Sequence, residues 1–248
     1  MDEFRRHRKI DAHTHIGSFG SPFNINFDTG RLLEQMDTYQ IEKTILCSSD
    51  CHGNEETAAA FRRYPDRIIP LMWINCSEGT PAYDELEHYL RDEQFAGAKL
   101  QTLFDGYTAD APCIDPAAEI CEQYEKPMFI HSGHPPFSLP WQIGLLAERH
   151  PRLSIVMIHM GHAHGVYVDA AIAMARKYSN IWLETSGTSM SCQIRNAYET
   201  VGHERVMFGI DSPFHHPTVE IQKILASGVD EKGLENIFFN NAAKFMKL

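Results

Sequence analysis

Short apolar runs and stretches with helical spacing alternate along the whole chain, and this rhythm constrains the fold more than any other feature. The runs are almost continuously apolar, which is typical of parallel strands whose two faces are both covered. Eight such runs predict strands at residues 9–12, 43–47, 68–74, 97–100, 127–130, 154–158, 181–183 and 206–210. The stretches between them predict helices at 30–39, 55–64, 82–91, 116–124, 140–150, 166–178, 189–201 and 219–226, followed by a last helix at 234–246.

Eight strand–helix units in 248 residues predict a (β/α)₈ TIM barrel, because this fold typically takes about 250 residues. We expect residues 1–248 to form a single domain, since the sequence contains no linker and no low-complexity stretch. An open doubly wound sheet is the alternative, and a glycine-rich phosphate-binding turn after the first strand would favour it. The segment that follows the first run, THIGSFGSPF at 14–23, lacks that turn. The barrel is therefore the favoured fold.

The composition indicates a cytoplasmic protein that binds a small molecule. The net charge of −11, from 22 basic and 33 acidic residues, argues against a nucleic-acid surface, which needs clustered Lys and Arg. No stretch approaches the roughly 18 apolar residues that a membrane span requires, and no apolar run follows the basic cluster at 5–9, as a signal peptide would demand. The six cysteines include no Cys-x-x-Cys pair, so reduced thiols are expected. These features do not fix the oligomeric state, and a homo-oligomer is possible.

Polar side chains stand at the ends of five of the eight runs. Because the carboxyl ends of barrel strands meet at one rim, where barrel enzymes place their catalytic groups, these side chains should converge. They are His13 and His15 after the first run, Lys99 after the fourth, His131 after the fifth, His159 after the sixth and Asp211 after the eighth. The sequence therefore predicts one polar site at the mouth of the barrel.

The spacing of His13 and His15 predicts a metal site. Residues i and i+2 of a strand point to the same side, so both imidazoles can bind one ion. His131 and Asp211 would complete a set of three histidines and one aspartate with room for water, which is typical of catalytic zinc, although Fe²⁺, Mn²⁺ and Co²⁺ accept the same ligands. A single histidine after a strand is more often a hydrogen-bonded structural residue. A whole cluster in an apolar barrel mouth would cost stability without a cation.

The motifs at these strand ends resemble those of the amidohydrolase superfamily, and most closely its amidohydrolase-related branch. They are DAHTH at 11–15, GAKLQ at 97–101, KPMFIHSG at 126–133, IVMIHMG at 155–161, NIWLETS at 180–186 and RVMFGIDSP at 205–213, in family order over nearly the whole chain. The resemblance implies a metal-dependent barrel with ligands at His13, His15, His131 and Asp211. It also implies that His159 is either a ligand of a second metal or a hydrogen-bonding activator.

Lys99 leaves the number of metal ions open. In two-metal members of the superfamily a lysine at this place is carboxylated and bridges the ions, whereas many members of the amidohydrolase-related branch use one metal. An uncarboxylated Lys99 would instead bind a substrate carboxylate. We expect one divalent ion, zinc, with a second ion held through Lys99 and His159 as the alternative. The chain departs from the branch at Gln101, where a His-Pro pair often follows the lysine motif, and at His162, where a glycine is common.

The expected chemistry is hydrolysis of a carbonyl-type bond. A bound divalent ion lowers the pKa of its water to about 7, so that hydroxide can attack an amide, lactone or ester. Asp211 would act as the base, and Asp211 or His159 would protonate the leaving group. The alternative is non-oxidative decarboxylation or hydration of an unsaturated or aromatic carboxylate by the same residues. Lys99, Trp73 and Phe19 are the candidate contacts of a small substrate that bears a carboxylate.

Substrate specificity is expected in the loops that follow the strands. The first of them, at 17–29, carries Phe19, Phe23 and Phe27 among glycines and a proline. This composition fits a mobile aromatic lid, and ordinary anchoring of the loop by its rings is the alternative.

Two further classes of function fit the sequence less well. A barrel nuclease that trims DNA ends would carry a glutamate in place of Lys99, and it would need a more basic rim than this acidic chain offers. A barrel that acts only as a binding scaffold would be expected to have lost metal ligands, and all four predicted ligands are present. A metal-dependent enzyme is therefore the favoured class.

Overall fold

The barrel predicted from the sequence is present in the computed structural model of the protein, which describes residues 2–162 and 164–248. Within these ranges eight parallel strands form one sheet in the order β1-β4-β5-β6-β7-β8-β9-β10. Their bounds are β1 Lys9–His15, β4 Ile41–Cys47, β5 Ile68–Trp73, β6 Gly97–Leu100, β7 Met128–His131, β8 Ile155–Ile158, β9 Ile181–Glu184 and β10 Val206–Met207. Most strand residues are buried, which explains why the runs in the sequence are almost continuously apolar.

The first and last strands close the sheet into a barrel. The backbone N–H of Asp211 donates to the carbonyl of His13 (2.7 Å), and that of His15 donates to the carbonyl of Ser212 (2.8 Å). A parallel bridge between Thr14 and Ser212 extends this pairing beyond the end of β10. The segment that carries Asp211 is therefore held beside His13 by the hydrogen bonds that close the barrel.

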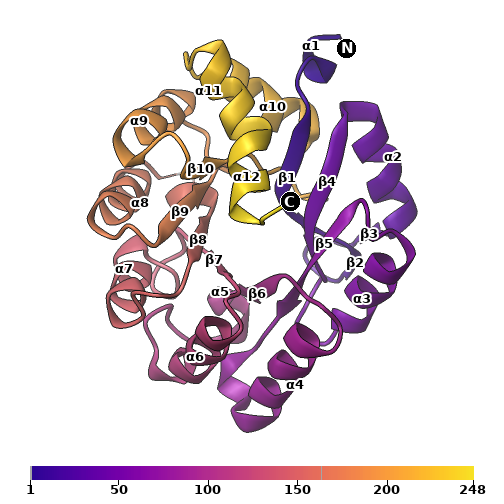
Figure 1. Cartoon of the computed structure of the whole chain (residues 1–248), viewed down its shortest axis with the longest axis vertical. Helices are drawn as coiled ribbons and strands as arrows, with labels where there is room; N and C mark the ends of the chain where they lie inside the picture. The colour runs from indigo at the N-terminus through magenta and orange to yellow at the C-terminus, as the bar shows by residue number, and fades with distance from the viewer. Residues whose placement is uncertain (1, 163) are drawn as a thin grey trace.

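Helices surround the strands as an outer ring (Figure 1). The helices predicted between the strands are all present, with their ends moved by one or two residues; for example, the Asp28 side chain accepts the N–H of Arg31 and sets the start of α2. No helix of the described chain is long and apolar enough to cross a bilayer. The bounds are α1 Asp2–Arg5, α2 Thr29–Tyr39, α3 Asn54–Arg63, α4 Thr80–Arg91, α5 Thr102–Asp105, α6 Asp115–Gln123, α7 Pro140–Arg149, α8 Gly165–Lys177, α9 Ser191–Val201, α10 Pro217–Leu225, α11 Glu231–Glu235 and α12 Asn241–Phe245.

The last predicted helix, at 234–246, is divided into three segments. α11 is followed by a π-helical turn at Asn236–Asn240 and then by α12, which lies across the strands in Figure 1. Phe245 of α12 packs on Phe129 and Trp182, with ring centroids 6.1 and 4.8 Å apart. Because these two residues lie near the amino ends of β7 and β9, α12 covers that end of the barrel.

Buried apolar side chains form two cores. The larger core packs strands against the outer helices, and the smaller one fills the barrel interior, where Ile10, Ile45, Phe129 and Val156 meet residues of the C-terminal segment. Burying one such side chain contributes about 1.5–3 kcal/mol.

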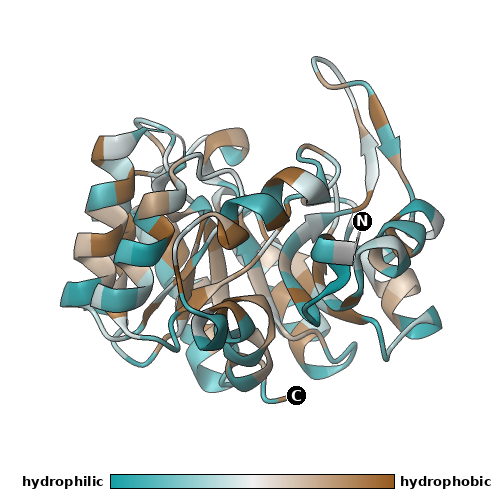
Figure 2. Cartoon of the chain, turned by 90° about the horizontal axis from the view of Figure 1, so that it is seen from above, coloured by the Kyte–Doolittle hydropathy of each residue, from teal (hydrophilic) through white to brown (hydrophobic). Residues whose placement is uncertain are grey.

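The segment at 17–29, predicted to be a loop, contains a β-hairpin instead. β2 (Gly17–Phe19) pairs antiparallel with β3 (Ile25–Phe27), and the hairpin stands out from the body of the molecule in Figure 2. The small residues and proline that suggest a loop lie in its turn, where the N–H of Phe23 donates to Gly20. β1 is also longer than predicted, because it runs through His15 instead of ending at residue 12.

Candidate active site

A cavity of about 270 Å³ opens at the carboxyl ends of the strands. Its base carries the histidines and the aspartate predicted from the sequence, and its walls are largely aromatic. The volume lies just below the range typical for drug-sized ligands, about 300–1,000 Å³, and so suits a small molecule. The lining residues are His13, His15, Phe19, Phe23, Ser49, Trp73, Gln101, Leu103, Phe104, His131, His134, His159, His162, Asp211, Phe214 and His215.

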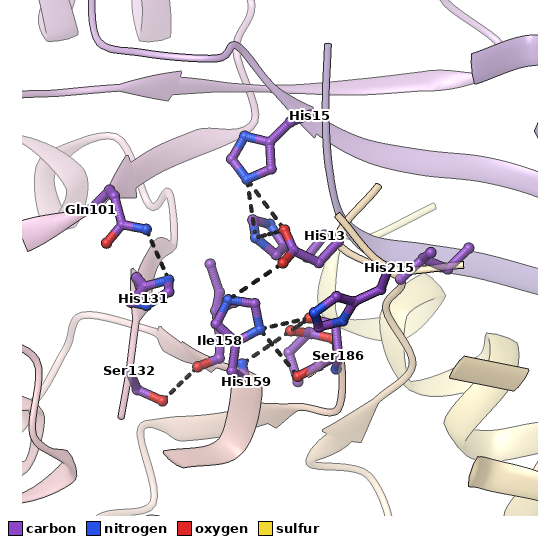
Figure 3. Close-up of polar contacts among 12 residues, drawn as sticks. His13, His15, Gln101, His131, Ser132, Ile158, His159, Ser186 and His215 are labelled. Carbon is purple, nitrogen blue, oxygen red and sulfur yellow. Dashed lines mark hydrogen bonds and ion pairs between the residues drawn. The ribbon is translucent and has the colours of Figure 1, made fainter. Parts of the chain in front are cut away.

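Three of the predicted metal ligands meet at the base of this cavity. Nε2 of His13 lies 3.2 Å from Oδ1 of Asp211, and Nε2 of His15 lies 3.5 Å from the same oxygen. The two Nε2 atoms are 3.3 Å apart, and Figure 3 shows both rings turned toward the same point. β1 places the two imidazoles on one side because residues two apart on a strand share a face, and closure of the barrel adds the carboxylate.

His159, the first residue after β8, reaches the same carboxylate. Its Nε2 lies 3.9 Å from Oδ2 of Asp211, on the opposite oxygen from His13 and His15. Both His159 (φ 66°) and Asp211 (φ 63°) adopt the left-handed backbone conformation, which costs a residue with a side chain free energy and is concentrated at functional sites. The fold thus maintains strain at the two residues predicted to handle protons.

Backbone and hydroxyl groups orient two of these imidazoles. Nδ1 of His15 lies 2.7 Å from the carbonyl oxygen of Ser48, and Nδ1 of His159 lies 3.1 Å from that of Ser186. Because a carbonyl only accepts, each Nδ1 carries the hydrogen and donates it. The Nε2 lone pairs of both rings are therefore left for the cavity, which is the usual arrangement of a metal-binding histidine.

His131, the fourth predicted ligand, lies beside this group without joining it. Its ring centroid is 4.7 Å from that of His159, but its Nε2 is 2.6 Å from Nδ1 of His134. Its Nδ1 accepts from the side-chain amide of Gln101 (2.9 Å), as Figure 3 shows. In this arrangement the hydrogen of His131 is on Nε2, where it is donated to His134. To bind an ion through Nε2, His131 would have to move this hydrogen to Nδ1.

Burial lowers the pKa of the cavity imidazoles and raises the pKa of the carboxyl group. The pKa of His15 falls to about 3, first because of burial and then because the Lys99 ammonium is near. Burial and Lys99 also hold the pKa values of His13 and His159 well below the ordinary value, and burial raises that of Asp211 well above it. Metal-binding histidines must be unprotonated, so these rings are ready to bind a cation.

The donor set fits a divalent cation. The ligand atoms of His13, His159 and Asp211 lie within 4.8 Å of one another, as do those of His13, His15 and Cys47. Among the described residues, the buried Nδ1 of His13 has no hydrogen-bond partner, so the protein does not fully satisfy the cluster by itself. Imidazole and carboxylate donors of this kind suit Zn²⁺, Mn²⁺ and Fe²⁺.

The three predicted substrate contacts lie at different depths. Phe19, on the hairpin, and Trp73, at the end of β5, both line the cavity. The Trp73 indole N–H donates to Asp105 (3.2 Å), which fixes the ring. Lys99 is fully buried and is not a lining residue, and its Nζ has no hydrogen-bond partner within the described part of the chain. Its role in substrate binding stays a prediction.

Glu184, at the end of β9, has a positioning role that the sequence did not reveal. Its buried carboxylate accepts the backbone N–H of His159 (3.1 Å) and the hydroxyl of Ser186 (2.7 Å). A Cβ on Gly209 would lie 2.2 Å from Oε1 of Glu184, so only glycine leaves room for this carboxylate. The signal in the sequence is the glycine in the GID motif at 209–211, beside a glutamate that ends the seventh run.

Comparison with known families identifies the chain. A model of the amidohydrolase family matches residues 10–248. The chain belongs to the amidohydrolase family. It is 23% identical to a decarboxylase of Emericella nidulans, over 79% of this chain and 75% of that protein. It is also 23% identical to the gamma-resorcylate decarboxylase of a Rhizobium strain, over the same shares of the two chains.

Solved structures share the fold of this amidohydrolase. A 2,6-dihydroxybenzoate decarboxylase bound to 2,6-dihydroxybenzoate superposes with a TM-score of 0.77 at 19% identity, over 98% of this chain and 100% of that chain. The 5-carboxyvanillate decarboxylase of Novosphingobium aromaticivorans, with bound manganese and 3-methoxy-4-hydroxy-5-nitrobenzoic acid, superposes with a TM-score of 0.80 at 18% identity, over 98% of both chains. The barrel fold is therefore confirmed.

The prediction of hydrolysis is wrong. The relatives and neighbours described above are decarboxylases, including enzymes of gamma-resorcylate, 2,6-dihydroxybenzoate and 5-carboxyvanillate, and they favour the alternative reaction. The residues could not reveal this, because the same ion, imidazoles and carboxylate suit either reaction, and a fold does not fix the chemistry it carries. The comparisons support an enzyme and a divalent metal, and the manganese in the neighbours does not single out zinc.

Proposed function

We propose that the protein is a metal-dependent, non-oxidative decarboxylase of a small hydroxylated aromatic acid, acting as one barrel domain over residues 1–248. The observation that carries this proposal is an acid–base pair, Asp211 and His159, at the base of a cavity with aromatic walls. The decarboxylases among the relatives and structural neighbours support it.

The walls of the cavity suit a planar ring. Phe19 and Phe214 contact each other edge to face, with centroids 4.9 Å apart, while Trp73 and Phe104 are nearly parallel at 6.5 Å. Aromatic side chains favour offset-stacked and edge-to-face contacts with another ring. An aromatic acid would bury its ring among these side chains and point its carboxylate toward the base.

His13, His15 and Asp211 would hold the metal ion, with His131 and His159 beside them. Zn²⁺ and Mn²⁺ both accept this set of nitrogen and oxygen donors, and zinc stays our first choice beside the manganese found in the neighbours. When bound, the ion would supply a Lewis acid for the carboxylate of the substrate and an adjacent oxygen.

Asp211 and His159 would handle the proton that decarboxylation requires. The bond between the ring and the carboxylate breaks, CO₂ leaves, and the ring carbon keeps the electron pair and gains a proton. Oδ1 of Asp211 faces His13 and His15, whereas Oδ2 faces His159. One carboxylate can therefore serve the metal site with one oxygen and deliver a proton with the other. Decarboxylation consumes one proton, which His159 would take up from solvent and pass to Asp211 after each turnover.

The test is release of CO₂ from 2,6-dihydroxybenzoate and 5-carboxyvanillate by protein loaded with Mn²⁺ or Zn²⁺. Asp211→Asn and His159→Asn should each lower kcat by at least about a hundredfold, the scale of general acid–base catalysis. His88→Asn, on an exposed face of α4, serves as the matched control and should keep full activity. A folded, metal-loaded protein that releases no CO₂ from hydroxybenzoates would overturn the proposal.

A further inference from the structure

His162 is held in a backbone conformation that normally belongs to glycine. Its φ is 63° and its ψ is −147°, a combination that is strained for any residue with a Cβ. A glycine here would adopt the conformation without this cost. An imidazole held here at a cost in free energy points to a use for the side chain.

The surrounding backbone fixes where this imidazole lies. The N–H of His162 donates to the carbonyl of His159 (2.7 Å). A Cβ on Gly133 would lie 2.4 Å from the carbonyl oxygen of Gly161 and 2.5 Å from Cβ of His162, so the loops after β7 and β8 are in close contact. His162 therefore cannot shift without moving the loop that carries His134.

The ring of His162 lies in the wall of the cavity. Its centroid is 4.7 Å from that of His134 and 5.3 Å from that of His159. Neither ring nitrogen of His162 forms a hydrogen bond with a residue in the ranges 2–161 and 164–248. A half-buried imidazole that is strained in place and has both ring nitrogens available is arranged for a ligand.

The cavity has two chemically different sides. Over His15 the neighbours are aromatic, with ring centroids of Trp73, Phe19 and Phe214 within 5.9–6.2 Å. Over His131 the neighbours are the imidazoles of His134 and His162. A ligand that fills the whole cavity would thus place apolar surface on one side and a polar substituent on the other.

We infer that His162 is a specificity-determining residue that binds a second ring hydroxyl of the aromatic acid, one that does not touch the metal site. The inference rests on the proposed function, since it assumes an aromatic acid with its carboxylate at His13, His15 and Asp211. A neutral imidazole offers one donor and one acceptor, and a phenolic hydroxyl is the ring substituent that matches both. His134, which already pairs with His131, supports the ring of His162 from the side.

The test compares two ligands that differ by this hydroxyl. Binding of 2,6-dihydroxybenzoate and of 2-hydroxybenzoate to the Mn²⁺-loaded protein is measured by calorimetry, in the wild type and in His162→Gly. The wild type should bind the dihydroxy compound about tenfold more tightly, the effect of one buried hydrogen bond. In His162→Gly this preference should fall below about twofold, while the affinity for 2-hydroxybenzoate stays unchanged and the thermal stability stays equal or rises.

Gln94→Gly provides the matched control. Gln94 also has a positive φ, 59°, but it is exposed and far from the cavity lining, so the variant should gain stability and keep the tenfold preference. The inference is overturned if the wild type does not prefer the dihydroxy compound, or if His162→Gly keeps that preference. If the wild type prefers 2,6-dihydroxybenzoate and His162→Gly does not, the inference is supported even when the protein releases no CO₂. Absence of CO₂ release would then contradict only the proposed reaction.

Discussion

Asp11 joins the last strand of the barrel to the first, because its Oδ1 accepts the backbone N–H of Ile210 at 2.9 Å. The same oxygen accepts the N–H of His13 at 3.1 Å. Both contacts are buried. One holds Ile210, the residue before Asp211, and the other holds His13, a predicted metal ligand. A single carboxyl group thus supports both the closure of the barrel and the geometry of the candidate metal site.

Replacing this carboxyl group should destabilise the protein. Asp11→Ala leaves two buried N–H groups without an acceptor, and each costs about 1–3 kcal/mol, so we expect a loss of about 2–6 kcal/mol in the free energy of unfolding. Asp11→Asn keeps an acceptor oxygen and should lose less than half of that. Urea unfolding of the metal-free protein measures both values. An Asp11→Ala variant as stable as the wild type would show that closure does not depend on this contact.

The metal-binding residues should differ in importance. His13→Ala removes the ring whose Nε2 is nearest Asp211 and should weaken Mn²⁺ or Zn²⁺ binding by at least about a hundredfold. His131→Ala should weaken it by about tenfold or less, because Nε2 of His131 faces His134. Competition with a chelating dye measures both. Equal losses would mean that His131 turns into the site when the ion binds.

The position of His131 illustrates what the sequence could not predict. The strand end predicts where its backbone lies, and β7 does end at His131. The direction of the ring depends on Gln101, from the loop after β6, and on His134, from the loop after β7, which contact its two nitrogens. Such contacts depend on loop geometry, including Gly133 with φ 95°, and no periodic pattern encodes them.

The fold could be predicted more completely than the directions of the site side chains, and the reason is physical. Parallel strands buried on both faces leave apolar runs that are easy to recognise, so all eight strands could be placed. The hairpin at 17–27 was missed because each of its strands has only three residues, too few for an alternating pattern to be recognised. Closure through Asp11 was missed because a single buried carboxyl group has no signature in the sequence.

Protonation of His15 should reduce stability at acidic pH. Its pKa is about 3 in the folded protein, below the ordinary 6.5, so protons bind more readily to the unfolded chain. The stabilising contribution is therefore complete above pH 6.5 and is lost as the pH falls toward 3. In the metal-free protein, His15→Asn should lower the dependence of the free energy of unfolding on pH by about 1.4 kcal/mol per unit between pH 4.5 and 6.5. Parallel curves for the two proteins would contradict this.

Lys99 can be tested for carboxylation and for its energetic cost. Burial lowers the pKa of its ammonium group, and Nζ has no partner among the described residues. An unmodified Lys99 is therefore costly to bury, and Lys99→Met should raise the stability of the metal-free protein by about 1 kcal/mol. Carboxylation predicts the opposite result, a loss of stability and of a second metal ion. Native mass spectrometry decides between them, since carboxylation adds the mass of one CO₂.

The hairpin should contribute to ligand binding without contributing much to stability. Phe23 at its turn is 44% exposed, yet its ring contacts Phe214 with centroids 4.8 Å apart and lines the cavity. Phe23→Ala should change the free energy of unfolding by less than about 0.5 kcal/mol. It should raise KM for an aromatic acid by about threefold to tenfold with kcat unchanged, because the contact with the ring is lost equally in the bound ground state and in the transition state.

Phe19 provides the contrast on the same hairpin. It is only 8% exposed and contacts both His15 and Phe214, so Phe19→Ala should cost about 3 kcal/mol of stability as well as raising KM. If Phe23→Ala lowered kcat and left KM unchanged, the hairpin would act on the reaction step or on product release, as a moving lid does. If neither constant changed, the ring of the substrate would not contact Phe23.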